Sequence, residues 1–290
     1  MRFESRLWVS TALVVAAGVS SNATASVQIN IQDIPEQNIT LVTAANPIFD
    51  GQLRKIFGTG SDMDDPALVV QRPFSVILEN GSGQTLIGMS FRYTEIDSAG
   101  TTTTHDLFFF ALDGVKDARI PPAGLAWVTP RRVMNHAWNQ AIPLQVQQSA
   151  IADMSKLAGL SRLTISLDAV IYDDGTFAGA NATHAFEQAT ASVWQKRLLA
   201  QELVRRQSAG QTDEEITGWL RGLNSPDPDY RVQDIDTLDW SNRYRAQYAR
   251  RLLLAYQSGG SEGAHKLARY TLDLPTVQIR QRAKDGRSRN

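Results

Sequence analysis

The stretch PFSVILENGSGQTLIGMSFRYTEID, residues 73–97, decides the fold class. Two runs rich in Val, Ile, Phe and Tyr flank the short turn GSG, a pattern typical of two strands joined by a tight turn. Similar runs, each bounded by turn residues, occur on both sides of it: SVQINIQ (26–32), NITLVTA (38–44), TTTTHDLFFFAL (101–112) and SRLTISLDAVIYD (161–173). Several short strands separated by turns predict an antiparallel β-sandwich over residues 26–179.

One segment of this half does not follow the strand pattern. Residues 131–159 contain few β-branched runs. Their apolar residues are too widely spaced for a half-buried strand. We therefore expect a helix or an irregular crossover between sandwich strands in part of this segment.

The chain from residue 180 to residue 272 has a helical pattern. Thr212 followed by Glu215 is a capping box that predicts the start of a helix. Apolar residues recur at spacings of three, four or seven, as on one face of an amphipathic helix: Phe186, Ala189, Val193, Ala200 and Leu203. The fold class is therefore α+β with segregated parts, with a boundary near residues 178–184 and a polar, basic tail at residues 273–290.

Charge also divides the chain. Residues 26–179 carry 10 Lys and Arg against 16 Asp and Glu, whereas residues 180–290 carry 17 against 13. Opposite net charges would attract the two halves to each other, or the helical half to an acidic partner. The whole chain has a net charge of only −1, so no overall field recruits nucleic acid.

The first 25 residues read as a secretory signal peptide. Arg2 and Arg6 precede the uncharged run LWVSTALVVAAGV, and Ala23-Thr24-Ala25 offers small residues at a cleavage site. The run has 13 residues, whereas a membrane-spanning helix needs about 20. We therefore expect cleavage after Ala25 and a periplasmic or extracellular protein; an uncleaved N-terminal membrane anchor is the alternative.

The chain contains no cysteine. This excludes cysteine nucleophiles, zinc sites with cysteine ligands and iron–sulfur clusters. It also means that an exported form is held together without disulfides, which is more typical of a bacterial than of a eukaryotic protein.

Three turn motifs suggest a family resemblance. They are LENGSG (78–83), EIDSAG (95–100) and IPPAG (120–124). In this order they resemble the turns of immunoglobulin-like modules of exported bacterial proteins, over about residues 73–130. The resemblance implies an immunoglobulin-like sandwich and brings no catalytic residues with it.

Acidic residues near the predicted boundary have two interpretations. If Asp173 and Asp174 met His184 and Glu187, these side chains could share a divalent ion. The alternative is structural: Asp174-Gly175 between two strands is the commonest signal for a type I′ hairpin turn. We expect the turn, and we expect neither a metal nor another cofactor.

An aromatic series marks a possible ligand site. Trp240, Tyr244 and Tyr248 recur every four residues with Arg245 among them, an arrangement that could bind a sugar, a peptide or an acidic segment. At helical spacing the same series also fits the core of a helical bundle.

The sequence favours a non-catalytic function. Its one G-x-S-x-G sequence, Gly259 to Gly263, follows a predicted helix and not a strand, so it is not a nucleophile elbow. Its Asp-rich loops at residues 62–65 and 227–229 are explained by turn formation and solvation. We expect an exported binding or interaction protein whose partner is a protein or a polysaccharide. The alternative is a secreted or periplasmic hydrolase that uses acidic residues near the junction of the halves.

Overall fold

The structure is a computed structural model. It describes residues 13–15, 27–34, 37–58, 66–111, 119–130, 132–135, 157, 159–224, 237–273 and 278–281. The chain forms two compact units. The first contains residues 1–173 and 177–183, and the second contains residues 174–176 and 184–290. No helix of the described ranges is long and apolar enough to cross a membrane.

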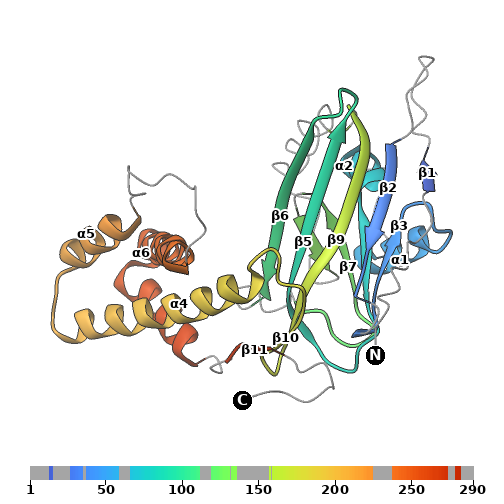
Figure 1. Cartoon of the computed structure of the whole chain (residues 1–290). Coiled ribbons are helices and arrows are strands. Elements are labelled where there is room, and N and C mark those ends of the chain that lie inside the picture. The colour runs from blue at the N-terminus through green and yellow to red at the C-terminus, as the bar shows by residue number, and fades with distance from the viewer. Residues whose placement is uncertain are drawn as a thin grey trace, which may run out of the picture. The chain divides into compact units, whose positions relative to one another are not determined.

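The first unit is built around two β-sheets (Figure 1). In the larger sheet the long strand β9 pairs with β2, β5 and β10, β1 pairs with β2, and β6 pairs with β5. The strands that residues 1–183 contribute to it are β1 (Leu13–Val15), β2 (Val27–Gln32), β5 (Leu86–Asp97), β6 (Thr102–Phe110), β9 (Leu160–Tyr172) and β10 (Thr176–Gly179). The smaller sheet has the order β3 (Ile39–Thr43), β4 (Val76–Asn80), β7 (Leu125–Thr129) and β8 (Arg132–Asn135).

Side chains from both sheets share one hydrophobic core. The alternation in β9 places Leu163, Ile165 and Leu167 in this core, as the period-two pattern predicted. Strand β4 is buried on both faces, because Val76 and Leu78 join the shared core while Ile77 joins a second cluster. A continuous apolar run is the sequence mark of such a doubly buried strand.

The second cluster contains a helix that the strand pattern did not predict. Helix α1 (Phe49–Phe57) packs Phe49, Leu53 and Ile56 against Ile77 and Trp127 of the smaller sheet. A short helix, α2 (Pro66–Gln71), follows, and a 3₁₀ turn covers Arg72–Phe74. The first unit is therefore mixed in secondary structure.

The expectation of a purely antiparallel sandwich is wrong. Strand β2 runs parallel to β9, with Ile29 paired to Leu163 and Ile31 to Ile165. More than a hundred residues separate the two strands in the chain. No hairpin therefore imposes an antiparallel direction on this pair. Within residues 131–159, expected as helix or irregular crossover, the described part includes strand β8, which pairs antiparallel with β7.

The second unit is helical. Its helices are α4 (Ala185–Ser208), α5 (Asp213–Asn224) and α6 (Thr237–Asp273), and α6 contains non-helical backbone at Gly260. The capping box is confirmed: the backbone N–H of Thr212 donates to Glu215 Oε2 at 2.7 Å, and the Glu215 N–H donates to Thr212 Oγ1 at 3.3 Å. Leu199, Leu203 and their partners on α5 and α6 form a core of this unit's own.

Candidate functional site

The Asp-Gly stretch after β9 forms a hairpin turn. The loop has three residues, Asp173 to Gly175, because Phe177 pairs with Ile171. Asp174 Oδ1 accepts hydrogen bonds from the backbone N–H of Thr176 at 2.8 Å and from its hydroxyl at 2.7 Å. Gly175 has φ 82°, while Asp174 is not among the residues with positive φ. The expected type I′ turn, which needs positive φ at both residues, is therefore wrong; a three-residue loop with glycine in the left-handed region replaces it.

The other members of the candidate metal set lie at the start of α4. His184 occupies the position before the helix with φ 58°, and its Nδ1 lies 4.0 Å from Glu187 Oε2. In the described ranges, no three His, Asp or Glu side chains come together in a way that could hold a metal ion. Asp173, Asp174, His184 and Glu187 therefore do not form a ligand set there.

A buried carboxylate that the sequence analysis did not single out lies in β9. Asp168 accepts hydrogen bonds from the backbone N–H of Ala182 and Thr183, both at 2.9 Å, and from the Thr183 hydroxyl at 2.7 Å. The Thr183 hydroxyl also lies 2.5 Å from that of Ser90. A charged residue inside the apolar run LTISLDAVIY was the signal for this network. Asp168 is only 6% exposed, and its carboxylate oxygens accept hydrogen bonds from Ala182 and Thr183. We therefore assign it a structural role.

Arg92 extends this polar network toward solvent. Its guanidinium donates to both oxygens of Asp106 at 2.9 and 3.0 Å, and to the carbonyl of Ala182 at 2.7 Å. The hydrogen bond to Asp106 raises the pKa of Arg92 above its ordinary value, against the opposing effect of burial. The bidentate pair holds β5 and β6 in register and connects them to the chain after β10.

The four residues of the predicted aromatic site differ in their exposure to solvent. Tyr244 and Tyr248 are 6% and 1% exposed, and their hydroxyls hydrogen-bond with Gln188 and Thr271. Burial raises the pKa of Tyr244 to about 12. Arg245 is exposed and donates to Asn242, while the half-buried Trp240 ring has the Arg243 guanidinium 5.4 Å from its centroid. A buried ring offers no face to a ligand, so only Trp240 and Arg245 of the four are accessible.

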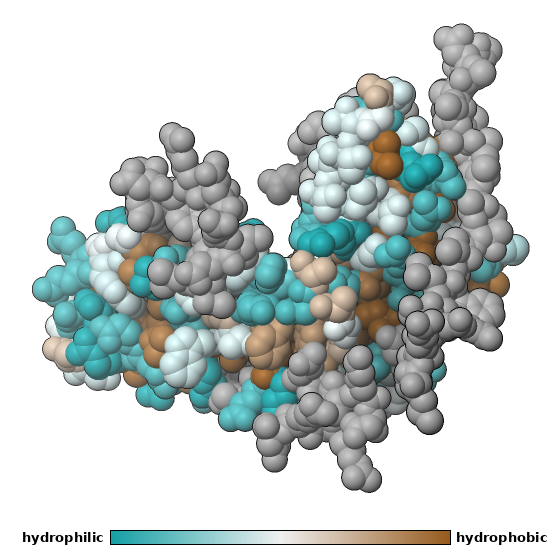
Figure 2. Space-filling view, viewed as in Figure 1, coloured by the Kyte–Doolittle hydropathy of each residue, from teal (hydrophilic) through white to brown (hydrophobic). Residues whose placement is uncertain are grey.

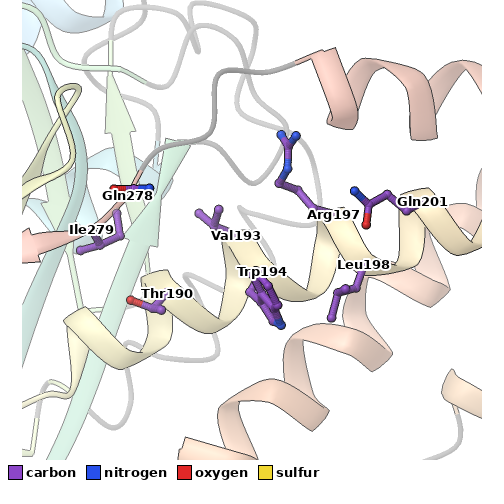
Figure 3. A pocket seen from close by; sticks show the side chains of 8 residues that line it. All are labelled: Thr190, Val193, Trp194, Arg197, Leu198, Gln201, Gln278 and Ile279. Atoms are coloured by element: carbon purple, nitrogen blue, oxygen red, sulfur yellow. The ribbon is translucent and has the colours of Figure 1, made fainter.

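A groove along α4 is a concave site of the helical unit (Figure 3). Its volume is about 440 Å³. Thr190, Trp194 and Leu198 follow one another every four residues and so form one row on the helix. Val193 and Arg197 form the adjacent row, and the lining also includes Gln201, Gln278 and Ile279. In Figure 2, tan and brown residues run along the part of this unit that α4 occupies.

Two of the large apolar side chains that line this groove are exposed to solvent. Trp194 is 62% exposed and Leu198 is 39% exposed, whereas the other large apolar residues of α4 are buried or half-buried. Arg197 is the one formally charged residue of the lining, and its Nη1 donates to the Leu272 carbonyl at 3.4 Å. The apolar stripe expected on this helix includes Val193 of the groove but not Trp194 or Leu198, because these two side chains lie outside the face that the stripe follows.

Lys196 lies beside the groove residues in sequence but is only 7% exposed. Burial, and to a smaller extent the positive charge of Arg251, lowers the pKa of Lys196 to about 7. A lysine that loses its charge near neutral pH makes the packing of α4 sensitive to pH.

No protein-family model, curated protein or solved structure matches this chain.

Proposed function

We propose that the protein is an exported, non-catalytic binding protein whose helical unit binds an apolar segment of a partner polypeptide in the α4 groove. The exposure of Trp194 on α4 is the observation that carries this proposal. Tryptophan is one of the residue types enriched where protein surfaces bind one another.

The energetics of the groove favour an apolar anchor. Full burial of an exposed apolar side chain is worth about 1.5–3 kcal/mol. Trp194 is 62% exposed and Leu198 is 39% exposed, so a partner that covers them gains part of this free energy, more at Trp194 than at Leu198. The groove volume of about 440 Å³ lies within the ordinary range for sites that accept a small molecule or a few side chains.

The polar groups of the groove favour a polypeptide with an acidic residue. Arg197 is the one formal charge of the lining, and the unit from residue 180 onward carries an excess of basic residues. A carboxylate beside the apolar anchor would complement both. Three lining residues are aliphatic, and these cannot stack on a sugar ring as an aromatic ring can: Val193, Leu198 and Ile279. This composition supports a polypeptide over a polysaccharide.

Export is the second part of the proposal. It is supported by the short apolar run after Arg6 and by the Ala23-Thr24-Ala25 site. The resemblance of residues 73–130 to immunoglobulin-like modules of exported bacterial proteins supports export as a fold-level analogy.

The groove can be tested with an aromatic anion. Anilinonaphthalene sulfonate, a dye that fluoresces in apolar sites, combines an apolar ring system with one negative charge. We expect saturable one-to-one binding to the folded protein. We expect Trp194→Ala to lower the dye's affinity at least about tenfold and Arg197→Gln to lower it less. A peptide with leucine and aspartate four residues apart should displace the dye, whereas a neutral oligosaccharide should not.

Leu254→Ala is the matched control, because Leu254 is an exposed leucine of α6 that does not line the groove. It should leave dye binding unchanged, and melting temperatures of all three variants should stay close to wild type. Equal dye binding by wild type and Trp194→Ala would contradict the proposed site. Displacement by the oligosaccharide alone would contradict the choice of partner.

A further inference from the structure

Strand β1 occupies an edge of the larger sheet. Residues Leu13, Val14 and Val15 pair antiparallel with Ile29, Gln28 and Val27 of β2. On its other side β2 pairs with β9. Strand β1 is thus the element that covers the outer backbone edge of β2 within the described ranges.

The residues of β1 belong to the apolar run of the signal peptide. Cleavage after Ala25 separates them from β2, which begins at Val27. The mature chain would then keep β2 on the sheet through β9 but lose the strand that covers its outer edge. A row of backbone N–H and C=O groups on that edge becomes available.

The sequence of β2 has none of the features that protect an edge strand. VQINIQ contains no lysine, no proline and no other charged residue, and the register with β9 runs from Gln28 to Gln32 without a bulge. Natural edge strands are usually blocked by one of these devices. Ile29 is buried in the shared core, so β2 stays ordered as part of the sheet.

From this arrangement we infer that signal cleavage opens a strand-binding site on β2, which accepts an extended apolar segment of a partner polypeptide in antiparallel orientation. The seated β1 defines the chemistry of the partner, since all three of its paired residues are apolar. A second copy of the protein could instead pair through its own β2. That strand has glutamine or asparagine at alternate positions, so it resembles the apolar β1 less well. Main-chain hydrogen bonds would supply the affinity, as in other strand-addition complexes. The inference rests on the proposed export and is independent of the α4 groove.

The order of events follows from the same topology. The precursor covers the β2 edge with its own N-terminal residues, so the site is closed before export. Removal of residues 1–25 opens it in the compartment where the partner is present. Binding is thereby restricted to the processed protein.

The test uses a fluorescent peptide with the sequence of residues 10–18 and two N-methylated forms of it. One form is methylated at the positions of Leu13 and Val15, the other at the position of Val14. In an antiparallel pair the N–H groups of alternate residues face the same neighbour, so only one form blocks the hydrogen bonds to β2. Fluorescence anisotropy then measures binding to the mature chain, residues 26–290, and to the full chain.

We expect one-to-one binding of the unmodified peptide to the mature chain. One methylated form should lose at least about tenfold in affinity and the other should bind nearly as well as the parent. The full chain should bind at least about tenfold more weakly than the mature chain, because β1 competes for the edge. Absence of binding to the mature chain, equal loss with both methylated forms, or a mature dimer that excludes the peptide would each overturn the inference.

N-terminal sequencing of protein exported from cells separates this inference from the export proposal. A chain that begins elsewhere than Ser26 contradicts the cleavage prediction itself. A chain that begins at Ser26 but does not bind the peptide contradicts only the strand-binding site.

Discussion

Replacement of Lys196 by methionine should stabilise the helical unit, and more so at low pH. The pKa of Lys196 is lowered from 10.5 to about 7 by burial and by the positive charge of Arg251. One pKa unit corresponds to about 1.4 kcal/mol, so the buried ammonium costs up to about 5 kcal/mol of folding free energy. Methionine keeps the length and apolar stem of lysine without the charge.

The sign of the pH dependence follows from the direction of the shift. Below pH 7 the amine is protonated in both the folded and the unfolded chain, so the full cost is present. Between pH 7 and pH 10.5 the folded chain releases its proton while the unfolded chain keeps it, and wild type becomes more stable as the pH rises. The advantage of Lys196→Met should therefore be largest below pH 7 and should vanish near pH 10.5.

Urea unfolding followed by circular dichroism at several pH values measures this difference directly. Lys266→Met is the matched control, because Lys266 is an exposed lysine that pairs with Glu262 one helical turn away. It should leave the free energy of unfolding nearly unchanged at every pH. A Lys196→Met variant that is less stable than wild type at pH 6, or whose advantage does not change with pH, would refute the reasoning.

Four further outcomes are expected. Gly175→Ala should destabilise the protein by about 1 kcal/mol in urea unfolding, because alanine is strained at φ 82°. Asp174→Asn keeps the Oδ1 acceptor for Thr176 and should change the melting temperature little, and a chelator should leave the melting temperature of wild type unchanged. Asp168→Ala should cost about 3 kcal/mol in the same urea assay, because it leaves buried donors unpaired; a cost near zero would contradict its structural role. Edman sequencing of the exported protein should begin at Ser26, and recovery of the intact chain in a membrane fraction would contradict cleavage.

Most of the secondary structure of this protein can be predicted from local sequence patterns. The strands β5 and β9 follow from alternating apolar residues, which one strand face must bury regardless of its partners. The start of α5 follows from Thr212 and Glu215. The side chain of each accepts a hydrogen bond from the backbone N–H of the other, within one helical turn. Such features depend on neighbours in the chain, so the sequence is sufficient to predict them.

The tertiary structure alone decided which of these elements meet, and in which direction. The parallel pairing of β2 with β9 and the packing of α1 against Trp127 join residues far apart in the chain. The three-residue hairpin differs from the expected type I′ turn because the register of β10 on β9 selects the loop length. Helical periodicity likewise shows that Tyr248 shares a face with its neighbours, but only the packing of α4 on α6 decides that this face is buried while Trp194 stays in water. Burial and pairing depend on the whole set of non-local contacts, which no window of sequence contains.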